Sequence, residues 1–188
     1  LFGGLLSAVI YLFAAAWKHK LHLWHLLDVN APGLIGYVAI SKIGCFINGC
    51  CFGTPTIMPW GIPYTAGSQA YQYYIAGTLN NLDFHTWKVY SDLIHPVQIY
   101  ESVIALLFLL IALALLRRKV MPGLVFLFIT GIYSLTRLGL LSLRANTEMG
   151  TFFYMLPWLY IAVASLSLLI LMQRLYFQYK LVNRGSDL

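Results

Sequence analysis

Long apolar runs separated by short polar segments dominate the chain. A helix needs about 20 residues to cross a bilayer at a rise of about 1.5 Å per residue. Five apolar runs approach or reach this length, at residues 1–17, 33–48, 96–116, 124–143 and 152–172. This pattern predicts an all-α, polytopic membrane helix bundle that forms one domain over residues 1–188.

Two stretches interrupt the apolar pattern. Residues 18–32 carry His19, His22 and His25 at helical spacing, which favours an interfacial segment at the level of the lipid headgroups. Residues 53–94 are rich in Thr, Tyr, Asn, Ser and Pro and show no strong helical period. We expect an outward-facing loop or small subdomain there, with room for short helices or strands.

Composition supports the membrane interpretation. Hydrophobic residues make up 60% of the chain and charged residues only 10%, whereas a soluble domain carries about 25% charged residues. The mean hydropathy is +0.76. The net charge of +6 is better explained by the positive-inside rule and anionic headgroups than by nucleic acid. Because the chain starts inside an apolar run and without Met, we expect that it is truncated at its N-terminus.

The basic residues give an orientation. Most lie at one end of the predicted helices: Lys18, Lys20, Arg117, Arg118, Lys119, Arg174, Lys180 and Arg184. The opposite end carries mainly Lys88 and Arg144. The positive-inside rule therefore predicts that residues 18–32, 117–122 and the C-terminus are cytoplasmic, and that 49–95 and 144–151 face outward.

Three ionisable residues lie inside predicted spans, where a charge costs roughly 2.5–3.5 kcal/mol on insertion scales. Glu101 and Arg137 each lie about 9 Å from the outer end of their helices, and Lys42 lies about 9–13 Å from the end of its own. A fourth, Arg144, lies at the membrane edge. Since three helices place these groups at similar depth, the sequence predicts one polar cavity that opens to the outer face.

Neighbouring side chains fit the same cavity. Tyr133 and Arg137 are spaced i, i+4 and share a helix face, while His95, Gln98 and Glu101 follow each other at i, i+3, i+6. Such a cavity suits an anionic headgroup, because arginine binds phosphate bidentately. Two structural alternatives stay open. Glu101 could pair with Arg137 or Lys42 only to hold helices together, and Lys42 could snorkel outward.

The cysteines lie together at the outer end of the second run, at Cys45, Cys50 and Cys51. Small thiols packed at a helix end are the simplest interpretation. A disulfide from Cys45 to Cys50 or Cys51 is feasible on an oxidising side. Zinc binding with His95 is a further alternative, but C-x4-C-C is not a common zinc spacing. We therefore expect no metal or other cofactor.

Several motifs, in order, resemble those of one family. They are Gly3-Gly4-Leu5, the stretch Lys42-Ile-Gly-Cys-Phe-Ile-Asn-Gly-Cys-Cys-Phe-Gly53, Pro59-Trp60-Gly61, His95-Pro-Val-Gln-Ile-Tyr-Glu101, and Tyr133-x-x-x-Arg137 followed by Arg144. Together they resemble the prolipoprotein diacylglyceryl transferase family over nearly the whole chain. The resemblance implies a multi-pass enzyme of the bacterial inner membrane, acting as a monomer with its cavity on the outer side.

The resemblance also implies a reaction and roles for residues. A diacylglyceryl group would pass from phosphatidylglycerol to the lipobox cysteine of a prolipoprotein, at its signal peptide, with release of glycerol phosphate. Arg137, Tyr133 and Glu101 would be catalytic. The residues implied in substrate binding are Lys42, Asn48, Gly53, His95, Gln98 and Arg144.

The chain departs from the family pattern at five positions. Lys42 replaces an arginine, Cys45 an asparagine, Cys50 a glutamate, Phe2 a histidine and Leu141 an acidic residue. These changes indicate a divergent Gly-Cys-Cys branch in which no obvious base remains for the acceptor thiol. Two other hypotheses therefore accompany the enzyme: a non-catalytic or differently specific phospholipid-binding paralogue, and a thiol-redox or metal-binding membrane protein.

Overall fold

A computed structural model describes residues 2–79, 92–118, 120–145 and 150–186, and the regular elements in this part of the chain are helices, beside turns, irregular segments and isolated β-bridges. The helices are α1 (Phe2–Lys18), α2 (Leu23–Ile47), α3 (Gln69–Leu79), α4 (Val97–Arg117), α5 (Leu124–Leu141) and α6 (Gly150–Ser186). Four described segments are long and apolar enough to cross a membrane: Leu23–Ile47, Val97–Arg117, Leu124–Leu141 and Tyr154–Lys180. The prediction of a polytopic helical bundle is confirmed.

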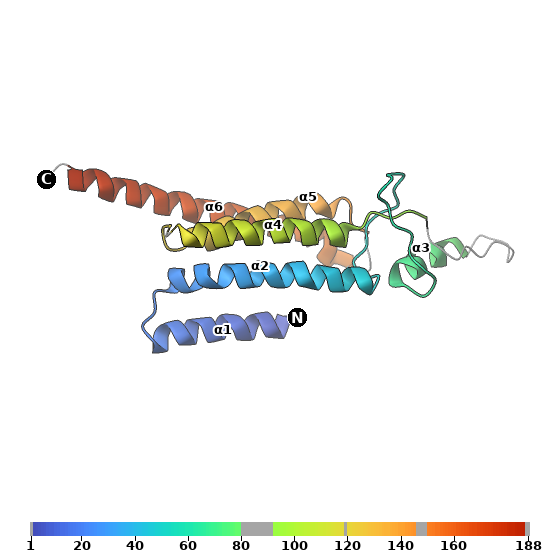
Figure 1. Cartoon of the computed structure of the whole chain (residues 1–188), viewed down its shortest axis with the longest axis horizontal. Helices are drawn as coiled ribbons and strands as arrows, with labels where there is room; N and C mark the ends of the chain where they lie inside the picture. Colours follow the sequence, from blue (N-terminus) through green and yellow to red (C-terminus); the bar gives the residue numbers. More distant parts are fainter. Residues whose placement is uncertain (1, 80–91, 119, 146–149, 187–188) are drawn as a thin grey trace.

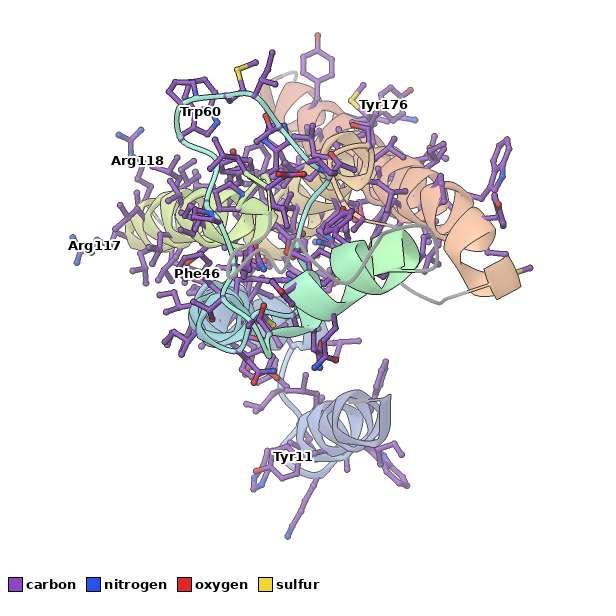
Figure 2. All side chains as sticks on the ribbon, turned by 90° about the vertical axis from the view of Figure 1, so that its right-hand side faces the viewer. Tyr11, Phe46, Trp60, Arg117, Arg118 and Tyr176 are labelled. Atoms are coloured by element: carbon purple, nitrogen blue, oxygen red, sulfur yellow. The ribbon has the colours of Figure 1, made fainter. Side chains whose placement is uncertain are left out.

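The long helices run side by side along the longest axis of the molecule, and α3 lies beyond one end of them (Figure 1). α1 is a 17-residue apolar helix that contacts only α2 among the described helices. Viewed from the end that carries α3, α1 stands apart from the rest of the bundle, with Tyr11 on it (Figure 2). The side chains of residues 1–9, Phe2 included, lie outside those the structure describes.

Small residues allow α2, α4 and α5 to approach closely. Ala39 on α2 and Ala105 and Ala112 on α4 are fully buried, and Val125 on α5 is equally inaccessible. Small side chains are the usual means of close helix packing in membranes, where lipid tails remove the hydrophobic drive for association. Ser102 on α4 donates a hydrogen bond to the carbonyl of Ala39 at 2.9 Å. This three-helix core holds the side chains of the candidate site at fixed positions.

The second helix begins ten residues earlier than the apolar run 33–48 indicated. α2 starts at Leu23 and continues through Pro32, so most of the expected interfacial segment is helical. Proline removes one backbone hydrogen bond, but membrane helices tolerate it where neighbours stabilise the chain. Here Pro32 is buried, and the Asn30 side chain donates to the carbonyl of Leu26 at 2.8 Å.

Asp28 explains why this first part of α2 is fixed. Its side chain is 3% exposed and accepts hydrogen bonds from the backbone N–H groups of Gly123 at 2.6 Å and Phe126 at 2.8 Å. These are unpaired N–H groups at the first turn of α5, which a carboxylate caps favourably. Gly123 has φ +92, and a Cβ there would meet the Trp24 ring at 2.6 Å. Asp28 on α2 thus caps the N-terminus of α5 at the predicted cytoplasmic end.

The connection between α2 and α3, residues 48–68, which we call the outer segment, folds back over the helix ends through short backbone pairings. Gly53 N–H donates to the carbonyl of His95 at 3.1 Å, and Thr54 N–H donates to that of Leu143 at 2.9 Å. Ala145 N–H donates to the carbonyl of Phe52 at 3.1 Å. These pairings join the segment after α2 to the start of α4 and the end of α5. A small apolar cluster lies beneath them, made of Phe52, Tyr64, Ala70, Ile94 and Ala145.

The ends of the bundle agree with the charge pattern along the chain. The connections α1–α2 and α4–α5 lie at the same end as the C-terminus, opposite the outer segment and α3 (Figure 1). Lys18, Lys20, Arg117 and Arg118 are exposed there. Lys88 and Lys119 lie outside the described residues, as does the side chain of Arg184.

Candidate functional site

A buried carboxylate joins three helices. Glu101 on α4 has a side chain only 2% exposed, and its Oε2 lies 2.5 Å from Nζ of Lys42 on α2. Its Oε1 accepts from the guanidinium of Arg137 on α5. We call Lys42, Glu101 and Arg137 the ion triad. The sequence placed these three residues at a similar depth in the membrane. In the fold, Glu101 contacts both Lys42 and Arg137.

The contacts of the ion triad bear on two alternatives left open by the sequence, a helix-joining role for Glu101 and an outward-pointing Lys42. Glu101 pairs with Lys42 and Arg137 at the same time, so the carboxylate does hold α2, α4 and α5 together. Lys42 does not snorkel outward, because its side chain is 14% exposed and bound to Glu101. Burying ions is costly unless they are paired, and here one carboxylate serves two cations.

The surroundings of the triad carry further positive charge. Lys42 interacts electrostatically with Arg137 and Arg144, and Tyr133 interacts with Arg144. Three cations against one carboxylate leave an excess of two positive charges near the outer ends of α2 and α5. Such an excess, partly shielded from water, favours binding of an anion and stabilises negative charge that develops during a reaction.

Tyr160 on α6 orients the arginine and was missed by the sequence reasoning. Its hydroxyl accepts from Nε of Arg137 at 3.3 Å and from Nη2 at 3.2 Å, and its ring centroid lies 5.6 Å from the guanidinium carbon. The available signal was depth: Tyr160 lies eight residues into the run 152–172, about 12 Å from its start. That is close to the depth of Glu101.

Three other predicted site residues, Gln98, His95 and Asn48, lie in the outer segment or next to it. Gln98 is 1% exposed and donates to the carbonyl of Cys50 at 2.7 Å, so it braces the turn after α2. The Tyr64 hydroxyl donates to Gln98 Oε1 at 3.3 Å, and burial raises the pKa of this phenol, which keeps the donor proton in place. His95 Nδ1 lies 3.2 Å from the Tyr100 hydroxyl. Asn48 is exposed at the C-cap of α2.

Gly53 sits where no larger residue fits. A Cβ at this position would lie 2.5 Å from the carbonyl oxygen of His95 and 2.7 Å from Cγ2 of Val97. Gly53 also forms an antiparallel bridge with Arg144. The glycine therefore lets three chain segments meet and fixes the backbone that carries Arg144.

The three cysteines come together in the fold. Their Sγ atoms lie within 4.8 Å of one another, and all three are free thiols with partly exposed side chains. His95 is not part of this group among the residues that the structure describes. Lys42 interacts electrostatically with Cys45 and Cys51, so the thiols border the ion triad.

An apolar groove runs between α2 and α5 and reaches the same region. Leu34 and Val38 line it on α2, and Ile129, Thr130 and Tyr133 line it on α5. Tyr133 lies at the outer end of the groove and precedes Arg137 by one helical turn. The groove can take a hydrocarbon chain, and its outer end lies next to the positive charges.

Comparisons with known proteins place the chain in a family. A sequence model described as prolipoprotein diacylglyceryl transferase matches residues 1–176. A relative in Tropheryma whipplei (strain Twist), named phosphatidylglycerol–prolipoprotein diacylglyceryl transferase, is 29% identical over 155 residues, which are 80% of this chain and 51% of the relative. A protein of the same name in Acaryochloris marina is 36% identical over 151 residues, covering 78% of this chain and 47% of the relative.

A third relative of that name, in Synechococcus elongatus, is 30% identical over 156 residues, or 78% of this chain and 48% of the relative. The chain thus spans about half the length of the curated relatives it matches. Residues 1–176, which the family model matches, include the ion triad, the cysteines and the outer segment.

Proposed function

Because this multi-pass chain belongs to the prolipoprotein diacylglyceryl transferase family, we propose that the whole protein transfers a diacylglyceryl group from phosphatidylglycerol to a prolipoprotein. The acceptor is the thiol of the lipobox cysteine next to the signal peptide. Its sulfur forms a bond to the terminal glyceryl carbon, the carbon–oxygen bond to the phosphate breaks, and glycerol phosphate leaves. The thiol proton is lost as the thioether forms.

The excess positive charge around Glu101 is the observation that carries this proposal. When the carbon–oxygen bond breaks, a phosphodiester with one negative charge becomes a monoester that gains a second. Arg137 and Lys42 are held in place by Glu101 before the reaction, and Arg144 lies close to Lys42. Preorganised cations of this kind stabilise developing charge without reorganisation. We assign Arg137 to the leaving phosphate, with Lys42 and Arg144 binding the headgroup.

The remaining predicted residues support that arrangement. Tyr133 contacts the groove between α2 and α5, which would hold a lipid chain with the headgroup next to Arg137. Gln98, Gly53, His95 and Asn48 shape the rim through which the acceptor peptide approaches. The positive-inside pattern supports a bacterial inner-membrane location with this rim on the outer side, where the protein would act as a monomer.

The test is glycerol phosphate release from phosphatidylglycerol by the purified full-length protein in the presence of a lipobox peptide. We expect release, and a loss of about 10²- to 10³-fold in Arg137→Ala, the usual effect of removing a preorganised charge stabiliser. Arg117→Ala is the matched control, because Arg117 is exposed at the opposite end of α4.

The outcomes separate the hypotheses. If both variants keep full activity, Arg137 does not stabilise the leaving phosphate. If the protein binds phosphatidylglycerol and never modifies the peptide, it is instead a phospholipid-binding paralogue, the function that the departures at Phe2, Cys45 and Cys50 favour.

A further inference from the structure

The three cysteines form a cluster that the transfer mechanism above does not use. Cys45 lies in the last turn of α2, while Cys50 and Cys51 lie in the turn that follows. Their Sγ atoms lie within 4.8 Å of one another. In a tetrahedral site with zinc–sulfur bonds of about 2.3 Å, sulfur atoms are about 3.8 Å apart. Side-chain rotations that shift the sulfur atoms by about 1 Å would therefore let all three bind one ion.

The backbone around the cluster is held in an unusual shape. Gly49 and Cys51 both have positive φ, at 66° and 58°. A non-glycine residue adopts this conformation rarely and at a cost, so the surrounding structure must impose it. Here Cys50 N–H donates to the carbonyl of Cys45 at 3.1 Å, and Gln98 donates to the carbonyl of Cys50 at 2.7 Å. The turn thus folds Cys50 and Cys51 back toward Cys45.

We propose that Cys45, Cys50 and Cys51 bind a zinc ion, and that its fourth position takes the thiol of the acceptor cysteine. Thiolates are soft ligands that suit zinc. Zinc prefers four ligands, and sites with three protein ligands keep an open position for water or substrate. All three cysteines are partly exposed, so a fourth ligand can approach from outside.

This role rests on the proposed function and supplies what the residues at the site lack. Phe2 stands where the resemblance to the family implies a histidine, so that histidine is not there to act as a base for the acceptor thiol. A thiol that coordinates zinc is deprotonated outright. The thiol proton passes to water on coordination, and the bound thiolate then attacks the glyceryl carbon as the bond to phosphate breaks. The product thioether is a weak ligand and dissociates, and zinc keeps its oxidation state throughout.

The position of the cluster fits this chemistry. Lys42 interacts electrostatically with Cys45 and Cys51 and also pairs with Glu101. Three thiolates and one zinc ion carry a net charge of −1, and a fourth thiolate makes it −2, which keeps the bound sulfur nucleophilic. Nucleophile and leaving phosphate would then lie on either side of Lys42.

The experiment uses the full-length protein, purified from zinc-supplemented cells and analysed for metal by mass spectrometry. We expect about one zinc per chain, and a fall to less than about a tenth of that in Cys45→Ser, Cys50→Ser and Cys51→Ser. Ile47→Ala is the matched control, because Ile47 is 80% exposed beside the cluster and should keep its zinc. A cobalt-substituted protein should show thiolate charge-transfer and tetrahedral d–d bands, and the d–d bands should change when a lipobox peptide is added.

Removal of zinc by a chelator should abolish glycerol phosphate release, and zinc should restore it. Release by a protein that holds no zinc would overturn this inference and leave the proposed function standing. The protein could also bind zinc, release no glycerol phosphate and show no response of the cobalt bands to the peptide. That result would contradict both the binding of the acceptor thiol by zinc and the proposed transfer. Zinc retained in all three cysteine variants at the level of the Ile47→Ala control would show that the cysteines are not the ligands.

Discussion

At the scale of single residues, the site is defined by one carboxylate shared between two cations. Glu101 neutralises only part of the charge of Lys42 and Arg137, and it fixes both side chains. Lysine at position 42 keeps the positive charge but lacks the planar fork of arginine. In the proposed reaction, bidentate recognition of phosphate oxygens would therefore fall to the arginines, and Tyr160 accepts hydrogen bonds that orient Arg137.

Tyr160→Phe tests this orientation. The change keeps the ring against the guanidinium and removes the hydroxyl that accepts from Nε and Nη2 of Arg137. Hydrogen bonds to charged groups contribute about 1.5–3 kcal/mol, which corresponds to about 10- to 100-fold in rate. We expect kcat for glycerol phosphate release to fall by this factor with KM for phosphatidylglycerol little changed, because the phosphate gains charge in the transition state.

Tyr176→Phe is the control for this prediction, since Tyr176 lies on the same helix and is 62% exposed. A purely structural role for Tyr160 would show as a lower melting temperature with kcat intact. Equal kcat in both variants would mean that Arg137 needs no orienting partner.

At the scale of elements, the outer segment is held by backbone pairings that leave no room for side chains at Gly53. Gly53→Ala should cost about 1–3 kcal/mol, as overpacking does, because its Cβ would meet the His95 carbonyl oxygen at 2.5 Å. We expect a lower melting temperature in detergent and faster proteolysis within residues 54–64. Gly44→Ala is the matched control, since nothing lies within 4 Å of its Cβ and alanine favours a helix. Equal behaviour of the two variants would contradict the close approach.

The sequence predicted some elements well and others poorly, for physical reasons. Apolar run length placed α4 and α5 within a few residues, and helical rise placed Lys42, Glu101 and Arg137 at one depth, because both depend only on local geometry. The sequence pattern placed the start of α2 after Pro32, because proline usually breaks a helix. In the fold α2 continues through Pro32, since neighbouring segments support the chain there.

Cross-helix partners could not be predicted in the same way. The hydrogen bonds of Asp28 to α5, and of Arg137 to Tyr160, depend on how the helices rotate against each other. Small residues such as Ala39 and Ala105 set that rotation, and their pattern alone does not say which faces meet. The sequence showed that the cysteines lie close along the chain but not how their thiols are arranged, because the positive φ of Cys51 is imposed by the surrounding fold.

At the scale of the whole molecule, the two ends of the bundle differ in charge and in chemistry. Exposed basic residues lie at the end that holds the α1–α2 and α4–α5 connections, and the triad, the thiols and the outer segment lie toward the other. Cations are retained on the cytoplasmic side during insertion. The site should therefore face outward, where phosphatidylglycerol headgroups and exported prolipoproteins are both accessible.

Single cysteines introduced into a background in which Cys45, Cys50 and Cys51 are serine test this orientation. Ile57→Cys in the outer segment, where the native side chain is 98% exposed, should react in intact cells with a maleimide that cannot cross the membrane. Arg118→Cys, exposed at the opposite end, should react only after the membrane is permeabilised. The background protein without added cysteine should stay unlabelled. The reverse labelling pattern would place the ion triad near the cytoplasmic face, where exported prolipoproteins could not reach it.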